Sequence, residues 1–497
     1  MQPAEAALGQ RAVQEELTSE AYHEALEAET SPPPPPPPPI PEPVIASDGV
    51  GDNTLADGTY DAVILGTGLT ECILSGLLSK RGLRVLHVDR NPYYGGACAS
   101  LDLTQMYERF TDGALIPAEL GNPRAYNIDL VPKLIMATGQ LVQILLHTDA
   151  TKYLEFKLVD GSFVHTGDKP HKVPVTAMDA LRSSLFSLLE KNRCRQFFSY
   201  INAYEPDDAA THNKLDLHKM SMRELYDYFG LQDTTRTLVG HALALYRNDA
   251  YVDAPALETV LRVKMYARGI ARYGSSPYIY PQYGLGELPQ AFARLSAVHG
   301  GVYMLNANIE RVLFDESTGR VCGVCDADGR RATCHLVVGD PSYFPDRVTR
   351  TDAVVRCYCI LRAPPEHTRE SHSCQIILPH RQVRPPRAHD IYVLVLGHTH
   401  RVAAPGKYIA LVSTTVETDA PAQEVEPGLR LLGGESNIVA RFVTVDDVYE
   451  PVDDGRRDGV FVSKSYDATT HFETATADVL DLYARIFGEP LVLGGRT

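Results

Sequence analysis

The chain has 497 residues, of which 44% are hydrophobic and 22% are charged, and its formal net charge is −16. This length exceeds one ordinary core, so we expect two domains with appendages, and the composition is typical of a globular protein. No apolar run approaches the roughly 18 residues that span a membrane. No basic segment offers a footprint for nucleic acid or anionic lipid. We therefore expect neither a membrane-spanning protein nor a nucleic-acid-binding protein.

The N-terminal segment differs in composition from the rest of the chain. Residues 1–57 hold eleven carboxylates and a single arginine, and they include eight consecutive prolines. Such prolines form an extended polyproline helix, which acts as a spacer or as a docking site for proline-binding modules. The segment lacks the basic and apolar regions of a signal peptide. We predict a disordered acidic and polyproline extension over 1–58 and a cytoplasmic protein.

The cysteine and histidine pattern gives no sign of a metal site. Nine cysteines are an odd number without disulfide-framework spacing, which suits a reducing compartment. Cys322 and Cys325 form a C-x-x-C motif, but residues three apart on a predicted strand point to opposite faces and cannot share an ion. His398 and His400 lack a second ligand pair at zinc spacing. We expect no bound metal.

After the extension the pattern becomes strand, glycine-rich turn, helix and strand, which is a β-α-β start. In a dinucleotide-binding turn, the third glycine of G-x-G-x-x-G lets the helix pack closely, and the helix N-terminus holds the diphosphate. Gly66 and Gly68 fill the first two positions, but Glu71 fills the third and adds bulk and negative charge. Asp89 stands where a ribose-binding acid belongs. The sequence predicts the dinucleotide-binding fold without a flavin or nicotinamide cofactor.

The remaining periodicity indicates two domains. Apolar residues between 126 and 250 recur at spacings of three and four, which favours helices, and strand patterns return from about residue 278. We predict a mixed α/β fold. It comprises a flavoprotein-like, Rossmann-type sheet domain over 59–125 and 246–497, with a mainly helical second domain inserted over 126–245.

Several stretches resemble the Rab GDP-dissociation inhibitors, nearly continuously from Tyr60 to about Gly488. They read "LGTGLTECILSGLLS", "HVDRNPYYGG", "GHALALYR", "ARYGSSPYIYPQYGLGELPQAFARLSA" and "SYDATTHFET". The resemblance implies a flavoprotein-like fold that uses no cofactor and catalyses no reaction. It implies a monomeric chaperone that binds prenylated, GDP-bound Rab GTPases and inhibits GDP release. Such a protein extracts these GTPases from membranes and recycles them during vesicle traffic, cycling transiently between cytoplasm and membrane.

The resemblance also implies a Rab-binding platform of five residues. Glu287 and Arg294 are two helical turns apart and therefore share a face. Val302 and Met304 are alternate residues of a predicted strand and share a side. Tyr94 completes the set. On residue type alone, Tyr94 would be an ordinary turn tyrosine, and the charged pair would be a solvated helix face.

Two further sites follow from the resemblance. Arg272 and Tyr273 match a mobile loop that contacts the Rab or its membrane receptor. The geranylgeranyl tail requires a hydrophobic cavity, because burying twenty carbons at about 0.8 kcal/mol per CH₂ is worth roughly 12 to 16 kcal/mol. In this family the cavity lies in the helical domain. Helical spacing selects candidates that would otherwise be ordinary core residues, namely Leu134, Leu141, Leu145, Phe197 and Leu225.

The chain departs from the family pattern in two places, and three alternatives stay open. The N-terminal extension is not part of the pattern, and the C-terminus ends at "GEPLVLGGRT" without the usual acidic and aromatic tail. A Rab escort protein, which presents Rab to a prenyltransferase, usually carries a large insertion in its sheet domain that is absent here. A flavin-dependent amine oxidase would share the fold. The third alternative is a degenerate scaffold whose polyproline arm is the functional part.

Overall fold

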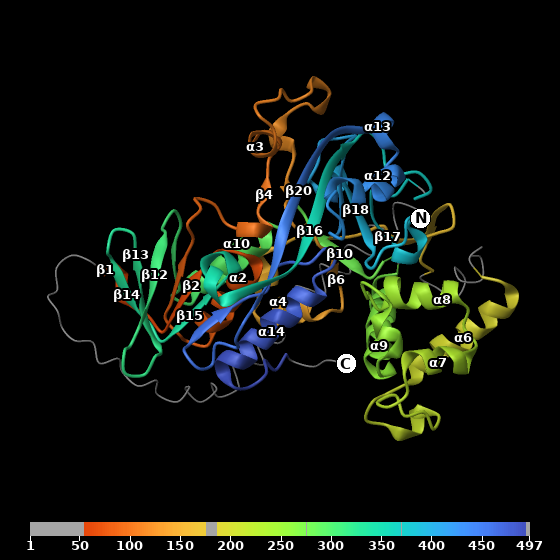
Figure 1. The fold of residues 1–497 in the computed structure, drawn as a ribbon, viewed down its shortest axis with the longest axis horizontal. Coiled ribbons are helices and arrows are strands. Elements are labelled where there is room, and N and C mark those ends of the chain that lie inside the picture. Colours follow the sequence, from red (N-terminus) through yellow and green to blue (C-terminus); the bar gives the residue numbers. More distant parts are fainter. Residues whose placement is uncertain (1–53, 175–185, 275, 369, 494–497) are drawn as a thin grey trace.

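A computed structural model describes residues 54–174, 186–274, 276–368 and 370–493 of the chain. Residues 1–53 of the expected extension lie outside this described part. The helices and strands form a large mixed α/β body and a helix-rich lobe. The lobe lies at the lower right of Figure 1. The mixed α/β architecture with a Rossmann-type sheet confirms the predicted fold class.

The body has two parts, each built on its own sheet. A five-stranded parallel sheet forms the centre of the first part. Its strands are short, continuous apolar runs that are largely buried, as in parallel sheets covered on both faces. Every neighbouring pair is parallel. The order is β11 (Val302–Met304), β3 (Val85–Val88), β2 (Ala62–Leu65), β15 (Leu336–Gly339) and β21 (Val460–Val462).

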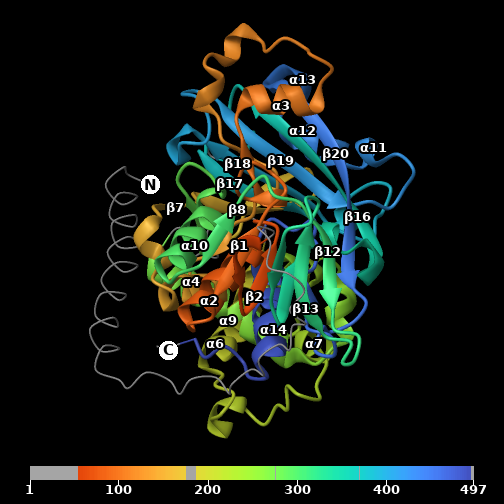
Figure 2. The same cartoon turned by 90° about the vertical axis from the view of Figure 1, so that its left-hand side faces the viewer.

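Helices cover one face of this sheet. Helix α2 (Leu69–Lys80) is buried on nearly every side, because it packs against both α10 (Glu287–Val298) and α14 (Glu473–Phe487). Figure 2 shows α2 and α10 side by side, to the left of strands β1 and β2. The glycine-rich turn lies between β2 and α2, at the carboxyl end of the sheet, where ligands of such folds bind.

A four-stranded sheet covers the opposite face. Its order is β1 (Thr54–Thr59), β14 (Arg331–Thr333), β13 (Val321–Asp326) and β12 (Ile309–Phe314). Val63 and Val324 belong to the buried core between the two sheets. The resulting three layers, helices, parallel sheet and smaller sheet, form the predicted Rossmann-type half.

Strand β1 corrects the expected boundary of the extension. Residues 54–58 were expected to be disordered, but they pair with β14, and Leu55 is fully buried between the sheets. Burial of that leucine and the pairing with β14 offset the cost of ordering this short segment. The acidic and proline-rich composition of the preceding residues hid the strand in the sequence pattern.

A seven-stranded sheet forms the second part of the body. One face contacts the main core, and the other carries a separate apolar cluster near the short helices α11 (Pro421–Glu424), α12 (Glu426–Leu431) and α13 (Gly434–Asn437). The long paired strands β16 and β20 descend diagonally from the top of the body in Figure 1. The order is β20 (Ile438–Pro451), β16 (Val348–Leu361), β19 (Tyr408–Thr415), β18 (Ile391–Gly397), β17 (Ser373–Leu378), β8 (Gly161–Thr166) and β9 (Lys169–Lys172).

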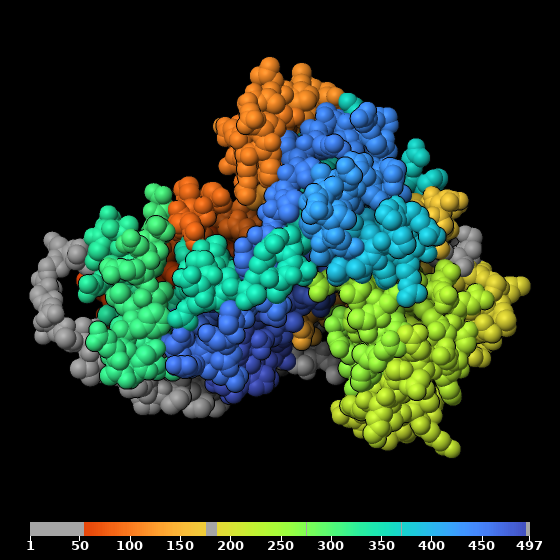
Figure 3. Space-filling view, viewed as in Figure 1, coloured from red at the N-terminus to blue at the C-terminus, as the bar shows by residue number. Residues whose placement is uncertain are grey.

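The helix-rich lobe protrudes from the body as a separate bulge in Figure 3. Ser221 caps its helix α7 through a reciprocal capping box with Glu224. An apolar interior holds the helices together. The lobe comprises α6 (Leu188–Ala203), α7 (Met222–Phe229), α8 (Asp233–Thr237), the π-helical turn η6 (Leu238–Leu243) and α9 (Ala256–Tyr273).

The helices occupy a different range from the expected 126–245. Strands β7 (Phe156–Leu158), β8 and β9 fall inside that range, and α9 lies beyond its end while packing against α6 and α7. The Asp160-Gly161 turn between β7 and β8 was the sequence signal for these strands. The smaller elements are β4 (Ser100–Leu101), α3 (Leu103–Phe110), β5 (Ile128–Asp129), β6 (Ile135–Met136), α4 (Gln140–His147) and β10 (Tyr278–Pro281).

Within the described ranges, no helix combines the length and the apolar character that crossing a membrane requires.

Candidate binding site

The glycine-rich turn keeps its backbone but fills its phosphate position with Glu71. Gly66 adopts a φ of +96°, and Gly68 precedes the first turn of α2. The Glu71 side chain is 1% exposed and folds back over Gly68, so closely that a side chain on Gly68 would collide with its carboxylate. Ser463 donates a hydrogen bond of 2.6 Å from its Oγ to Glu71 Oε1. The carboxyl group thus occupies the space that a diphosphate would need.

The charge of Glu71 matters less than its volume. Burial, assisted by the neighbouring Asp340, raises the pKa of the Glu71 carboxyl to about 8, which favours its protonated form. Burial likewise raises the pKa of Asp340, whose carboxylate lies against Gly66. The raised pKa works against the negative charge expected at Glu71, while the expectation of bulk agrees with the geometry.

Asp89 closes the turn from the other side. One carboxylate oxygen accepts hydrogen bonds from the backbone N–H of Thr67 at 2.6 Å and from its hydroxyl at 2.5 Å. The other oxygen accepts from the backbone N–H of Asn91 at 2.7 Å. These bonds engage the Asp89 carboxylate, which would otherwise be the group that binds a ribose. The residues present do not fit a dinucleotide, because its diphosphate would meet the Glu71 carboxyl and the carboxylates of Asp89 and Asp340.

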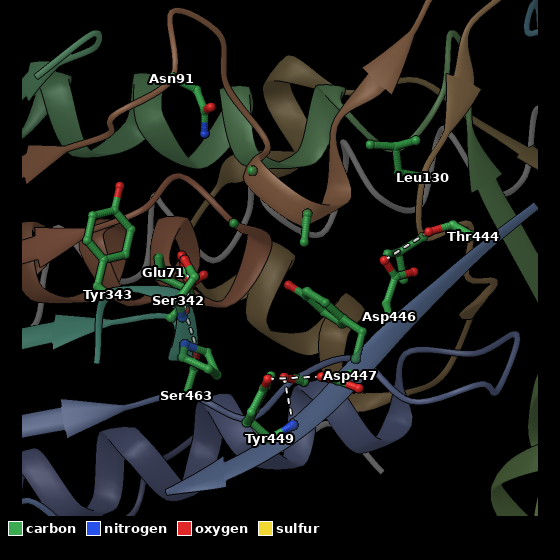
Figure 4. Close-up of a pocket in the computed structure, with 18 of the residues that line it drawn as sticks. Glu71, Asn91, Leu130, Ser342, Tyr343, Thr444, Asp446, Asp447, Tyr449 and Ser463 are labelled. Carbon is green, nitrogen blue, oxygen red and sulfur yellow. Dashed lines mark hydrogen bonds between the residues drawn. The ribbon is translucent and has the colours of Figure 1, made fainter. Parts of the chain in front are cut away.

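A cleft of about 350 Å³ lies beside this turn. In Figure 4, Glu71 points toward Ser463, while Asp446, Asp447 and Tyr449 line the opposite wall from β20. Asp447 accepts a hydrogen bond from the Tyr449 hydroxyl at 3.1 Å. The acidic groups that line the cleft therefore already have partners within the chain.

A second hollow, which we call the α10 hollow, lies at the edge of the same parallel sheet. Its volume is about 390 Å³, and its lining includes Tyr94, Tyr153, Glu287, Arg294 and Tyr303. Tyr94 comes from the loop after β3, whereas Glu287 and Arg294 lie two turns apart on α10. Three of the five expected platform residues thus line a single hollow.

The two charged residues of the α10 hollow, unlike the buried acids of the glycine-rich turn, are half-buried or exposed. Partial burial raises the pKa of Glu287 above its usual value. The guanidinium of Arg294, an exposed residue, lies 4.5 Å from the centroid of the Tyr153 ring, in cation–π geometry. The hollow therefore combines an acid, a base and three aromatic rings.

Val302 and Met304 do not line the α10 hollow. They are half-buried on the edge strand β11 and pack against the core between the two sheets. The intervening Tyr303 points to the other side, where its ring stacks on His87 at 4.4 Å and lies 6.0 Å from Tyr94. Tyr303 and Tyr153 were missed by the sequence analysis, although strand alternation could have identified Tyr303.

Arg272 and Tyr273 form the end of helix α9 rather than a loop. Gly274, at a φ of +84°, follows the last helical residue, and the Tyr273 ring is buried. Their contact with a partner stays a prediction.

The five lipid-pocket candidates divide between two places. Phe197 and Leu225 lie inside the helix-rich lobe, on α6 and α7. Leu134 forms an isolated β-bridge with His471. Helix α4, which carries Leu141 and Leu145, packs against α14 and β6 in the body. All five candidates are buried, and the body holds Leu134, Leu141 and Leu145.

Two residue pairs, Cys322 with Cys325 and His398 with His400, were expected not to bind a metal ion. Cys322 is half-buried and Cys325 is buried on strand β13, and each of the nine cysteines, all within the described ranges, is a free thiol. His400 is buried, and burial lowers its pKa to about 3. Neither pair belongs to a group of ligands close enough to share an ion among the described residues.

Comparison with known proteins gives a consistent result along the chain. A sequence profile for GDP dissociation inhibitor matches residues 56–497. A guanosine nucleotide diphosphate dissociation inhibitor of Arabidopsis thaliana is 51% identical over 438 residues, which are 88% of this chain and 97% of that protein. Guanosine nucleotide diphosphate dissociation inhibitor 2 of the same plant is 50% identical with the same coverage.

Solved structures agree with the sequence relatives. The crystal structure of a Rab GDI from Plasmodium falciparum has a TM-score of 0.83 and 44% identity, covering 87% of this chain and 99% of that one. An oxidoreductase from Methanosarcina mazei, at 15% identity and a TM-score of 0.54, shares the fold alone, with 85% and 99% coverage. The resemblance in the sequence is thereby confirmed. The chain belongs to the GDP dissociation inhibitor family, whose members regulate small GTPases and are not enzymes.

Proposed function

We propose that this protein binds GDP-bound Rab GTPases at the α10 hollow, slows their release of GDP and extracts their prenylated forms from membranes. Family membership supports the GTPase as partner, and the solved relative named a Rab GDI supports the Rab class. The single observation that carries the location is the convergence of Tyr94, Glu287 and Arg294 on one hollow.

The chemistry of the α10 hollow suits a protein partner. Arginine and tyrosine are over-represented among the residues that dominate interface energies, particularly where they are surrounded by packed neighbours. Arg294 is held over Tyr153, so less side-chain entropy is lost when a partner carboxylate or carbonyl binds it. Glu287 adds an acceptor of opposite charge two turns away, which fixes the orientation of the partner.

The helix-rich lobe is our proposed site for the geranylgeranyl tail. Phe197 and Leu225 supply an apolar interior between α6 and α7, and Phe197 contacts Phe229 edge-on at 5.5 Å. Leu188 and Leu189, at the start of α6, are 86% and 61% exposed. Because the candidates are fully buried, α6 and α7 must separate to admit the tail, and the exposed leucines would then line its entrance.

Liposome extraction of prenylated, GDP-loaded Rab tests this proposal. We expect the double variant Leu188→Asp and Leu189→Asp to lose most extraction and still bind unprenylated, GDP-loaded Rab, since these exposed side chains contribute little to the fold. Leu115→Asp is the matched control, because that leucine is 92% exposed outside the lobe. Full extraction by the double variant and by a folded Phe197→Ser variant would contradict the assignment of the lobe.

A further inference from the structure

A cluster of two histidines and two aspartates lies where the helix-rich lobe meets the seven-stranded sheet. His241 is on the π-helical turn η6, and Asp249 begins the short helix η7 (Asp249–Asp253). His380 follows β17, and Asp390 immediately precedes β18. One potential ligand atom from each of His241, Asp249 and His380 lies within 4.8 Å of the others. Single-turn π-helical segments occur frequently at functional sites.

The two imidazole rings are oriented by a shared carboxylate. Asp390, which is fully buried, contacts His241 Nδ1 at 2.6 Å through one oxygen and His380 Nδ1 at 3.2 Å through the other. The opposite ring nitrogens, both Nε2, consequently face Asp249, at 3.1 Å from His241 and 3.3 Å from His380. Histidines that ligate metals usually donate their second ring N–H to such a carboxylate, which fixes the ring.

We propose that His241 Nε2, His380 Nε2 and an Asp249 carboxylate oxygen form a site for one divalent transition metal ion, with zinc as the best match. Two imidazoles and one carboxylate are a zinc ligand set, and ligands at 2.0–2.1 Å in a tetrahedron are about 3.3 Å apart. His241 Nε2 lies 3.1 Å from Asp249 Oδ1 and His380 Nε2 lies 3.3 Å from Asp249 Oδ2, so each imidazole nitrogen is at that separation from one oxygen of the carboxylate. All three ligand atoms lie within 4.8 Å of one another. Asp249 is 25% exposed, so a water molecule can take the fourth position.

The charge balance and the location both suit an ion. Asp249 and Asp390 carry two negative charges, which one divalent ion neutralises as fully as two protons on the histidines would. His380 and Asp390 come from the sheet, whereas His241 and Asp249 come from the lobe. The ion would therefore fasten the lobe to the body, a property independent of the proposed Rab and lipid sites.

Arg381 is the built-in competitor for this site. Its Nη2 lies 2.5 Å from Asp249 Oδ2, and its side chain is 70% exposed, so it can leave when an ion binds. Without an ion, the same residues would form a cluster of ion pairs in which Arg381 and the protonated histidines share Asp249. The effect of Arg381 distinguishes the two forms. Its guanidinium competes with the ion for Asp249, whereas it stabilises the ion-pair cluster.

A zinc titration of the chelator-treated full chain tests the proposal, with ZnCl₂ in competition with a chromogenic chelator. We expect one equivalent to bind the wild type, His380→Gln to weaken that binding at least about tenfold, and Arg381→Gln to tighten it. His218→Gln is the control, because His218 is an exposed histidine of the lobe region. Zinc should also raise the Tm of the wild type but not that of His380→Gln.

Equal zinc affinity of the wild type, His380→Gln and Asp249→Asn would mean an adventitious ion only and would overturn the proposal. Circular dichroism of each metal-free variant establishes that the comparison is made between folded proteins. Cobalt substitution provides a second readout, because its visible absorption reports four-coordinate geometry. Absence of that spectrum in the wild type would equally overturn the site.

Discussion

The glycine-rich turn and the α10 hollow lie at the same parallel sheet but treat their polar side chains in opposite ways. At the turn, Glu71 and Asp89 are buried and accept hydrogen bonds from neighbouring residues of the chain. At the hollow, Arg294 is exposed and Glu287 is half-buried. A site whose polar groups satisfy one another supports the fold, whereas a site whose charges remain accessible can bind a partner. Mutations at the two places should therefore affect different properties.

The largest expected effect is on stability, at the turn. Asp89→Ala removes a buried carboxylate that accepts four hydrogen bonds from Thr67 and Asn91. Unsatisfied buried donors cost about 1–3 kcal/mol each, so we expect the free energy of unfolding to fall by about 3–5 kcal/mol. Urea denaturation measures this change. A loss below about 1 kcal/mol would show that Asp89 is not a structural group.

The next effect is on binding, at the hollow. Arg294→Ala and Glu287→Ala should each weaken binding of GDP-loaded Rab by about 1–4 kcal/mol, the range for charged interface anchors. Titration calorimetry measures the affinity, and the Tm should change little because Arg294 is exposed. Glu310→Ala, an exposed acid on β12, is the control. Parallel losses of Tm and affinity would place these residues among the structural groups.

Glu71 adds a pH dependence to the stability of the turn. Its pKa rises from an ordinary 4.5 to about 8 on folding, so between these values the folded state keeps a proton that the unfolded state has lost. Its contribution is therefore complete below pH 4.5 and is lost as the pH rises toward 8. Glu71→Gln should become more stable relative to the wild type by about 1–3 kcal/mol between pH 5 and 8. Parallel stability curves for the two proteins would contradict this.

The smallest expected effect tests whether Tyr153 positions Arg294 or contacts the partner itself. Tyr153→Leu keeps an apolar side chain but removes the ring beneath the Arg294 guanidinium. A cation–π contact at an exposed site is worth about 0.5–1 kcal/mol, so Rab affinity should fall by roughly two- to fivefold. In the background of Arg294→Ala, the same change should have no further effect. Additive losses in this double-mutant cycle would mean that Tyr153 contacts the partner directly.

Local patterns in the sequence predicted the Rossmann-type half well. Continuous apolar strands and the Gly66-x-Gly68 turn specify a β-α-β unit, and the position of Glu71 indicated an altered phosphate site. The raised pKa of Glu71 could not be predicted, because it depends on burial and on Asp340, which is distant in the sequence. Strand β1 was missed because one buried leucine, Leu55, is too short a signal beside an acidic, proline-rich segment.

The candidate sites were predictable only where the sequence carries a local pattern. The spacing of Glu287 and Arg294 on one helix predicted their shared face, whereas Tyr153 joins them through tertiary packing. His241 and His380 show the same limit, since two rings that face one carboxylate are 139 positions apart in the sequence. Spacing rules for metal ligands find neighbours in the chain and miss ligands that only the fold brings together.

The most direct test of the central claim is the rate of GDP release from prenylated Rab loaded with a fluorescent GDP analogue. The wild-type chain and the Glu310→Ala control should slow this release strongly, because both keep the charges of the α10 hollow. The double variant Glu287→Ala and Arg294→Ala should leave the rate close to that of Rab alone at matched concentrations. Inhibition by the double variant equal to that of the wild type would contradict the assignment of the α10 hollow as the Rab-binding site.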